Sequence, residues 1–132
     1  MVIASHNPGK VTEIRELLTP LKISVEGARE LGLAEPEETG KTFTENSELK
    51  ARLAAETAGL PALADDSGIT ICALGGAPGI YSARWGGKNS DFNKAMLKVY
   101  KELDKKDKKW RLKKISARFI CALVIYWPNR KK

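Results

Sequence analysis

The segment "PALADDSGITICALGGAPGIYSARW", residues 61–85, places two adjacent aspartates, Asp65 and Asp66, between two short apolar runs. We interpret "PALA" and "ITICAL" as short strands on either side of a "DDSG" turn, and the glycine-rich "GGAPG" as a loop. Two carboxylates at the end of a buried strand are costly unless something binds them, because they lose hydration there. The segment therefore predicts a strand end that carries a binding site, and a divalent metal is our candidate ligand.

Strands and helices alternate along the chain that precedes this segment. Residues 2–5 ("VIAS") and 22–28 ("KISVEGA") are predicted strands, and "VTEIRELLTPL" between them has apolar residues at helical spacing. Asn7 is a suitable N-cap for this first helix, and Pro8 fits its first position because a missing N–H is harmless there. Pro20 ends the helix.

The second predicted helix is the clearest element of the chain. It covers "TFTENSELKARLAAETAG", residues 42–59. Thr42 and Glu45 form a capping-box pattern at its start, and Gly59 followed by Pro61 ends it.

The last third of the chain adds one helix and one strand. "SDFNKAMLKVYKEL" (90–103) predicts a third helix capped by Ser90, and "ISARFICALVIYW" (115–127) predicts a final strand. The apolar face of the helix is expected to consist of Phe92, Met96, Val99 and Leu103. Strands that alternate with helices favour an α/β fold of packed layers, in a single domain that spans residues 1–132.

Composition narrows the class of protein. The chain has 132 residues, 42% of them hydrophobic, and its longest apolar run of nine residues falls short of the roughly 20 that a membrane helix needs. No secretory pattern opens it, so we expect a cytoplasmic protein with no membrane partner. Cys72 and Cys121 lie inside apolar runs and are expected to be reduced core thiols.

Charge is distributed unevenly. Residues 1–90 hold 9 Lys/Arg against 12 Asp/Glu, whereas residues 91–132 hold 14 against 4. Such a basic half is one signature of a nucleic-acid-binding module. The aromatic residues of this half do not alternate with the basic ones, however, and "DKKDKKWRLKK" (104–114) is more simply a solvated connector. We therefore do not expect nucleic acid as the partner.

Two further segments have residues suited to a phosphorylated ligand. "SHNPGK", residues 5–10, lies where the first strand passes into the first helix, and a helix start attracts phosphate through its free N–H groups. Simple helix capping is the alternative. "EETG" supplies Glu37 and Glu38, which together with Asp65 and Asp66 would offer Mg²⁺ hard oxygen ligands. Solvated turn residues are the alternative for these acids. On the second helix, Lys50 is either a surface residue or a phosphate contact.

Taken in order, "SHNPGK", "EETGKTFTENSELKA", "LADDSG" and "LGGAPGIYSARW" resemble the Ham1 family of inosine triphosphate pyrophosphatases. The resemblance runs from residue 2 to about residue 125. It implies an α/β fold with a mixed central sheet flanked by helices. It also implies Mg²⁺-dependent hydrolysis of non-standard purine nucleoside triphosphates, such as ITP, dITP and XTP, to a monophosphate and pyrophosphate.

The resemblance also assigns roles to residues. Glu37 and Asp66 would hold Mg²⁺, and Asp66 would in addition accept the proton of the attacking water. Ser67 would touch the substrate, and Lys50 would face its phosphates. The triphosphate loop would consist of Ser5, His6, Asn7, Pro8, Gly9 and Lys10.

The chain departs from the family pattern at its end, where the later "FGYDP" and "SHR" segments, which help to build the base pocket, are absent. We therefore expect a fold that lacks the family's C-terminal part, and "FICALVIYW" as an apolar strand at an open sheet edge. A second copy of the chain is the expected cover, which predicts a homodimer. Two alternatives to the enzyme stay open: a catalytically impaired nucleotide-binding or dimer-partner protein, and a basic nucleic-acid-binding module.

Overall fold

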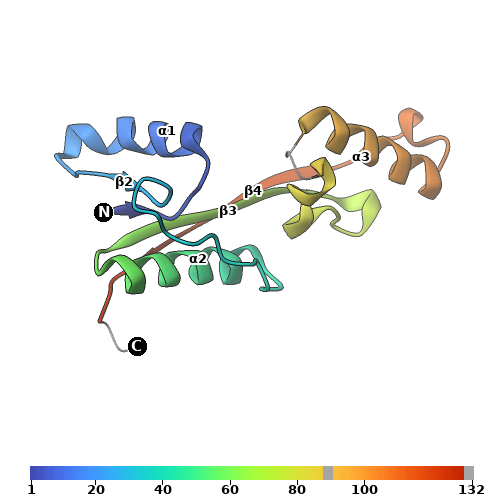
Figure 1. Cartoon of the computed structure of the whole chain (residues 1–132). Helices are drawn as coiled ribbons and strands as arrows, with labels where there is room; N and C mark the ends of the chain where they lie inside the picture. Colours follow the sequence, from blue (N-terminus) through green and yellow to red (C-terminus); the bar gives the residue numbers. More distant parts are fainter. Residues whose placement is uncertain (88–90, 130–132) are drawn as a thin grey trace. The chain divides into compact units, whose positions relative to one another are not determined.

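The computed structural model describes residues 1–87 and 91–129, and within them a four-stranded sheet forms the centre of an α/β fold (Figure 1). The strands are β1 (Val2–Ile3), β2 (Glu26–Gly27), β3 (Ala62–Ile71) and β4 (Ala117–Tyr126). Their order in the sheet is β2-β1-β3-β4, so β3 is an inner strand and β4 an edge. Strand β1 pairs in parallel with both β2 and β3, whereas β3 and β4 run in opposite directions in Figure 1. The predicted mixed sheet is confirmed.

Helices α1 (Pro8–Leu18) and α2 (Phe43–Ala58) cover opposite faces of the parallel strands (Figure 1). Neighbouring residues of a strand point to opposite faces, so Val2 and Ile3 pack against different helices. Val2 is buried with residues of α2, whereas Ile3 is buried with Val11 of α1 and Val25. Each face of the sheet therefore has its own small core.

Both helices begin as the sequence predicts, and α2 also ends as predicted, whereas α1 ends at Leu18 and Pro20 lies in the 3-10 turn Thr19–Leu21 that follows. The Asn7 side chain caps α1 by accepting hydrogen bonds from the N–H groups of Gly9 and Lys10. Thr42 caps α2 through the N–H of Glu45 at 3.1 Å. Gly59 ends α2 in the left-handed conformation with φ 70°, which glycine adopts without strain.

The aspartate segment differs from the prediction. Residues 62–71 form one continuous strand, and "DDSG" is part of it rather than a turn between two strands. Strand β1 pairs only with Ala62 and Leu63, and β4 is the other neighbour of β3 in the sheet. Pairing within the sheet overrides the local turn preference of Asp-Ser-Gly. The strand ends at Ile71, and Cys72–Leu74 is a single 3-10 turn. Likewise, only Glu26–Gly27 of the predicted strand 22–28 pairs in the sheet.

The chain divides into two compact units, Met1–Asp66 with Ala122–Lys132, and Ser67–Cys121. The second unit contains α3 (Phe92–Lys106), which packs against the short turns Cys72–Leu74 and Arg84–Gly86. Asp91 caps α3 through the N–H groups of Asn93 and Lys94; the predicted cap, Ser90, lies outside the described residues. The single domain over residues 1–132 stays a prediction.

Several apolar side chains that the sequence assigns to the core are exposed. On α3 only Leu103 of the predicted apolar face is buried, whereas Phe92 is 80% exposed. No residue of β4 is buried, and Phe119 is 86% exposed. Both cysteines are exposed, so the prediction of buried thiols is wrong. An apolar run becomes a core only where another layer covers it, and no described layer covers these side chains. Among the described residues, no helix is long and apolar enough to span a membrane.

Candidate functional site

The site lies in the first unit, where the short strand β1 ends beside β3, which continues to Ile71. Val2 pairs with Ala62 and Ile3 with Leu63, so the chain after Ile3 leaves the sheet next to the following residues of β3. Ser5 and His6 follow β1, and Asp65 and Asp66 continue β3 beside them. The carboxyl ends of parallel strands are the usual ligand-binding edge of α/β sheets. Two sequence segments far apart in the chain are brought together in this way.

The loop between β1 and α1 is held by its own hydrogen bonds. Ser5 Oγ accepts from the N–H of Asn7 at 3.1 Å, and His6 Nε2 donates to the carbonyl of Leu33 at 2.9 Å. His6 therefore fixes the loop to a neighbouring segment. The N–H groups of Gly9 and Lys10, which a phosphate would use, are occupied by the Asn7 cap. Pro8 follows that cap as the first residue of α1.

Two lysines from different helices reach the aspartate pair. Lys10 Nζ lies 3.0 Å from Asp65 Oδ2. Lys50 Nζ, from the second turn of α2, lies 3.5 Å from Asp66 Oδ1 and 3.4 Å from Glu38 Oε1. Lys50, Asp66 and Glu38 form one charged cluster, whereas Lys10 and Asp65 form a separate ion pair, because adjacent residues of β3 point to opposite faces of the sheet.

Asp66 is the most deeply buried carboxylate of this cluster, with a side chain that is 8% exposed. Burial raises its pKa, the Lys50 ammonium opposes that rise, and the neighbouring Glu38 carboxylate adds to it. No hydrogen bond of normal geometry reaches Oδ2 of Asp66 or Nδ2 of the buried Asn46, although the Asn46 side chain lies close enough to lower the pKa of Asp66. Buried polar atoms are nearly always satisfied in a resting structure, so this pair indicates a place for a ligand or ordered water.

The segment before α2 brings its acids to the cluster through Asn46. Asn46 is 1% exposed, and its Oδ1 accepts from the N–H of Gly40 at 2.7 Å. There is no room for a side chain at Gly40, where a Cβ would lie 2.6 Å from Asn46 Oδ1 and 2.7 Å from Glu45 Cβ. Glu45 itself accepts from the N–H of Lys41, so it has a structural role. This close packing sets the position of the acidic loop.

Asp66 and Glu38 are hard oxygen donors that fit a divalent metal. Magnesium is commonly held by one or two carboxylates, several waters and substrate phosphates, so a pair of acids is sufficient. The unpartnered Oδ2 of Asp66 is a free donor of the required kind. Among the described residues there is no cluster of three or more acidic, His or Cys side chains that could bind a metal without such help.

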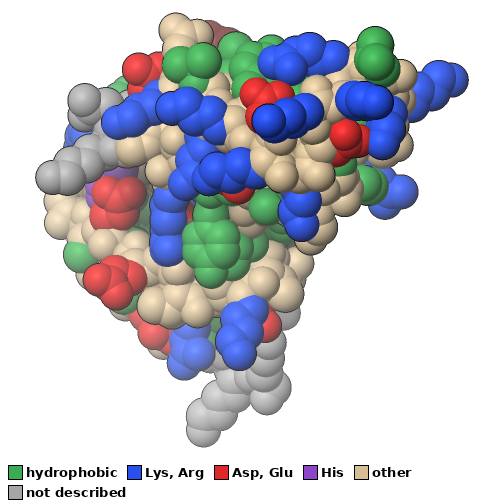
Figure 2. Space-filling view, turned by 90° about the vertical axis from the view of Figure 1, so that its right-hand side faces the viewer, with side chains coloured by type: hydrophobic (Ala, Val, Ile, Leu, Met, Phe, Trp, Pro, Cys, Tyr) green, Lys and Arg blue, Asp and Glu red, His purple; other side chains and the backbone are tan. Residues whose placement is uncertain are grey.

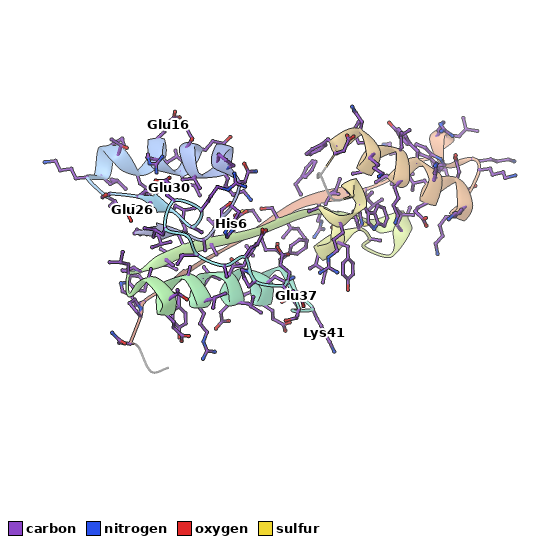
Figure 3. The ribbon with its side chains drawn as sticks, viewed as in Figure 1. His6, Glu16, Glu26, Glu30, Glu37 and Lys41 are labelled. Carbon is purple, nitrogen blue, oxygen red and sulfur yellow. The ribbon has the colours of Figure 1, made fainter. Side chains whose placement is uncertain are left out.

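The predicted site residues are therefore brought together in part. Lys50 and Asp66 meet in the cluster, whereas Lys10 pairs with Asp65. Glu37 is exposed in the loop before α2, where Figure 3 shows it together with Lys41, and it is Glu38 that reaches Lys50. Ser67 is exposed and follows Asp66 on β3.

The sequence analysis gave Asn46 no role of its own. The signal that points to it is its position in α2, next to the buried stripe formed by Ser47, Ala51, Ala54 and Ala55. A fully buried amide at the start of a helix, beside a glycine of an acidic loop, is a pattern that sequence reasoning can use.

The fold and the ion pairs define an α/β protein whose inner strand carries two buried aspartates, each paired with a lysine from a different helix. The profile of the Ham1 family matches residues 1–132, and the chain belongs to this family.

Relatives and solved structures agree with this assignment. A dITP/XTP pyrophosphatase of Zymomonas mobilis is 53% identical over 129 residues, which are 98% of this chain and 60% of that protein. A dITP/XTP pyrophosphatase of Rhodospirillum centenum is 54% identical over 129 residues, which are 62% of that protein. The structure of a HAM1 protein from Coxiella burnetii is 45% identical with a TM-score of 0.82, over 94% of this chain and 61% of that one. The chain thus spans about 60% of the length of these relatives.

Proposed function

We propose that this chain hydrolyses non-standard purine nucleoside triphosphates, of the ITP, dITP and XTP type, to a monophosphate and pyrophosphate. The observation that supports this most is the charged cluster of Lys50, Asp66 and Glu38, with the Lys10–Asp65 ion pair at the neighbouring residue of β3. Two relatives whose names give dITP and XTP as substrates are more than 50% identical to this chain.

The lysines bind the triphosphate in this proposal. Lys10 opens α1, where the helix dipole favours an anion, and Gly9 allows the backbone to approach it closely. Lys50 faces the same edge from α2. Ser67, directly after Asp66, contacts the substrate, and Ser5 to Pro8 complete the phosphate loop.

Asp66 is the proposed catalytic residue and, with Glu37 or Glu38, a ligand of Mg²⁺. A bound divalent ion would supply charge neutralisation on the phosphates. Asp66 would orient water toward the α-phosphorus and accept its proton; a raised pKa makes a carboxylate a better base. The position of Glu38 beside Asp66 supports it as the second acid, although the family motif points to Glu37.

A second copy of the chain is the proposed protein partner. The outward-facing side chains of β4 include Phe119, Leu123 and Ile125, each at least 45% exposed, and β4 is an edge of the sheet. An edge strand with an apolar face pairs readily with another chain. Light scattering at tens of micromolar tests this: we expect a dimer, and a monomer would contradict it.

The activity is tested by incubating the chain with ITP, XTP or GTP and Mg²⁺ and measuring pyrophosphate and orthophosphate separately. We expect pyrophosphate from ITP and XTP, and at least a hundredfold loss in Asp66→Asn, in line with the usual size of general-base contributions. Glu16→Gln, which removes one exposed carboxylate from α1, is the matched control and should retain the activity. Orthophosphate alone, or equal rates in Asp66→Asn, would contradict the proposal.

A further inference from the structure

The two carboxylates that fit a metal already share a cation in the ligand-free chain. Lys50 Nζ lies 3.4 Å from Glu38 Oε1 and 3.5 Å from Asp66 Oδ1, so one ammonium group bridges acids from two different segments. The Lys50 side chain is only 16% exposed. A charge that is this poorly hydrated depends on its carboxylate partners.

The other lysine of the site is engaged separately. Lys10 Nζ contacts Asp65 Oδ2 at 3.0 Å, and none of its ion pairs among the described residues involves Glu38 or Asp66. The two lysines therefore pair with adjacent aspartates of β3, and only Lys50 contacts the pair of acids that fits the metal. This difference makes Lys10 a natural control for Lys50.

Lys50 leaves part of the site unsatisfied. Asp66 Oδ2 and Asn46 Nδ2 are buried without hydrogen-bond partners, although both belong to residues that are at most 6% exposed. A purely structural buried ion pair is usually completed by further hydrogen bonds. The Asn46 side chain also lowers the pKa of Asp66, so this amide and this carboxylate are neighbours beside the acids that Lys50 bridges.

We infer that Lys50 holds the place of the divalent cation in the ligand-free chain and gives it up when a triphosphate binds. This inference rests on the proposed function. Glu38, Asp66 and Lys50 together carry one net negative charge, and a metal added beside Lys50 would face a like charge at close range. A triphosphate gives Lys50 a new anionic partner, which frees both carboxylates for the metal. Metal and nucleotide then strengthen each other's binding, and this coupling is reciprocal.

The experiment compares metal binding without nucleotide in the full chain and in two variants, Lys50→Met and Lys10→Met. Free Mn²⁺ is measured by its electron paramagnetic resonance signal during titration with MnCl₂. We expect Lys50→Met to bind Mn²⁺ about tenfold more tightly than the unmodified chain, which is the order of effect for removing one like charge near a divalent ion in a partly hydrated site. Lys10→Met should change the affinity by no more than about threefold, since Lys10 pairs with a different aspartate.

A second titration includes ITP. The unmodified chain should bind Mn²⁺ more tightly in the presence of ITP, and Lys50→Met should lose most of this gain. Unchanged or weaker Mn²⁺ binding in Lys50→Met, in a sample whose circular dichroism matches the unmodified chain, would overturn the inference. Lys50→Gln repeats the comparison with a polar neutral side chain and covers a failure of the Met variant to fold.

The two proposals fail in different ways. If the unmodified chain binds no ITP, the proposed function fails, while the nucleotide-free Mn²⁺ comparison still decides the role of Lys50. If neither the unmodified chain nor Lys50→Met binds Mn²⁺ at millimolar concentrations, the inference about Lys50 is wrong.

Discussion

Gly40→Ala is expected to displace the acidic loop. The new Cβ would lie 2.6 Å from Asn46 Oδ1, 2.7 Å from Glu45 Cβ and 3.0 Å from the Asn46 backbone nitrogen. Asn46 and the helix backbone cannot retreat easily, because Asn46 is 1% exposed at the start of α2. The loop must therefore move, and the 2.7 Å hydrogen bond from Gly40 N–H to Asn46 Oδ1 is lost.

The size of the effect follows from these two changes. Loss of one hydrogen bond costs about 1 kcal/mol, and overpacking at a close contact adds about 1–3 kcal/mol. Because the loop is partly exposed and can detach, the total should stay near the lower end of this sum, at about 2 kcal/mol of unfolding free energy. Urea denaturation followed by circular dichroism measures it.

Thr39→Ala is the control for Gly40→Ala. Thr39 is the exposed neighbour of Gly40, so its truncation should change the unfolding free energy by less than about 0.5 kcal/mol. Mn²⁺ affinity should fall in Gly40→Ala, because displacement of the loop moves Glu38 away from Asp66. A Gly40→Ala chain with the same stability and the same Mn²⁺ affinity as the unmodified chain would refute the close contact between loop and helix.

Three further predictions concern the core and the titrating groups. Ile3→Ala should destabilise the chain by about 2–5 kcal/mol in urea, since Ile3 is 1% exposed, while Phe119→Ala, at an 86% exposed position, should cost less than about 0.5 kcal/mol; equal costs would contradict the assigned core. Burial raises the pKa of Asp66, so the charged form of this carboxylate opposes folding. The stability of the unmodified chain relative to Asp66→Asn should therefore fall as pH rises from about 4 through that raised pKa, and a difference that does not change with pH would contradict the burial effect. The hydrogen bond from Trp110 Nε1 lowers the pKa of Asp104, so the stabilisation by this bond is complete above about pH 4 and is lost as pH falls through the lowered pKa. Tryptophan fluorescence should show this transition in the unmodified chain and not in Asp104→Asn.

Local signals in the sequence predict the helices of the first unit well. Asn7 and Pro8 at the start of α1, and Thr42 and Gly59 at the ends of α2, have the predicted roles, because caps depend on a few neighbouring residues. The predicted turn at "DDSG" is wrong because the conformation of this segment depends on pairing with strands far away in the chain. The burial of Cys72 and Cys121 fails for a related reason: an apolar run shows what can be buried, not what covers it.

The candidate site is also predictable from the sequence only in part. Residue type and position suggest Asp66, Lys10 and Lys50 as site residues, and the structure pairs Lys50 with Asp66 and Lys10 with Asp65. The choice between Glu37 and Glu38 has no sequence signal, because irregular backbone sets the direction of each side chain in the loop. The contact that positions this loop, from Gly40 to Asn46, depends on tertiary packing that no periodicity reveals.

The Asn7 cap of α1 offers a way to detect an anion that binds at the start of this helix. The N–H groups of Gly9 and Lys10 each have one hydrogen to donate, and the Asn7 side chain takes both. Any anion that binds these groups must first displace that side chain, which then rotates into solvent or finds another partner. The amide resonances of Gly9 and Lys10 should therefore shift together, and the side-chain amide signals of Asn7 should change with them. In a nuclear magnetic resonance titration, these three residues would record occupancy of the helix start even when no bond in the ligand is broken.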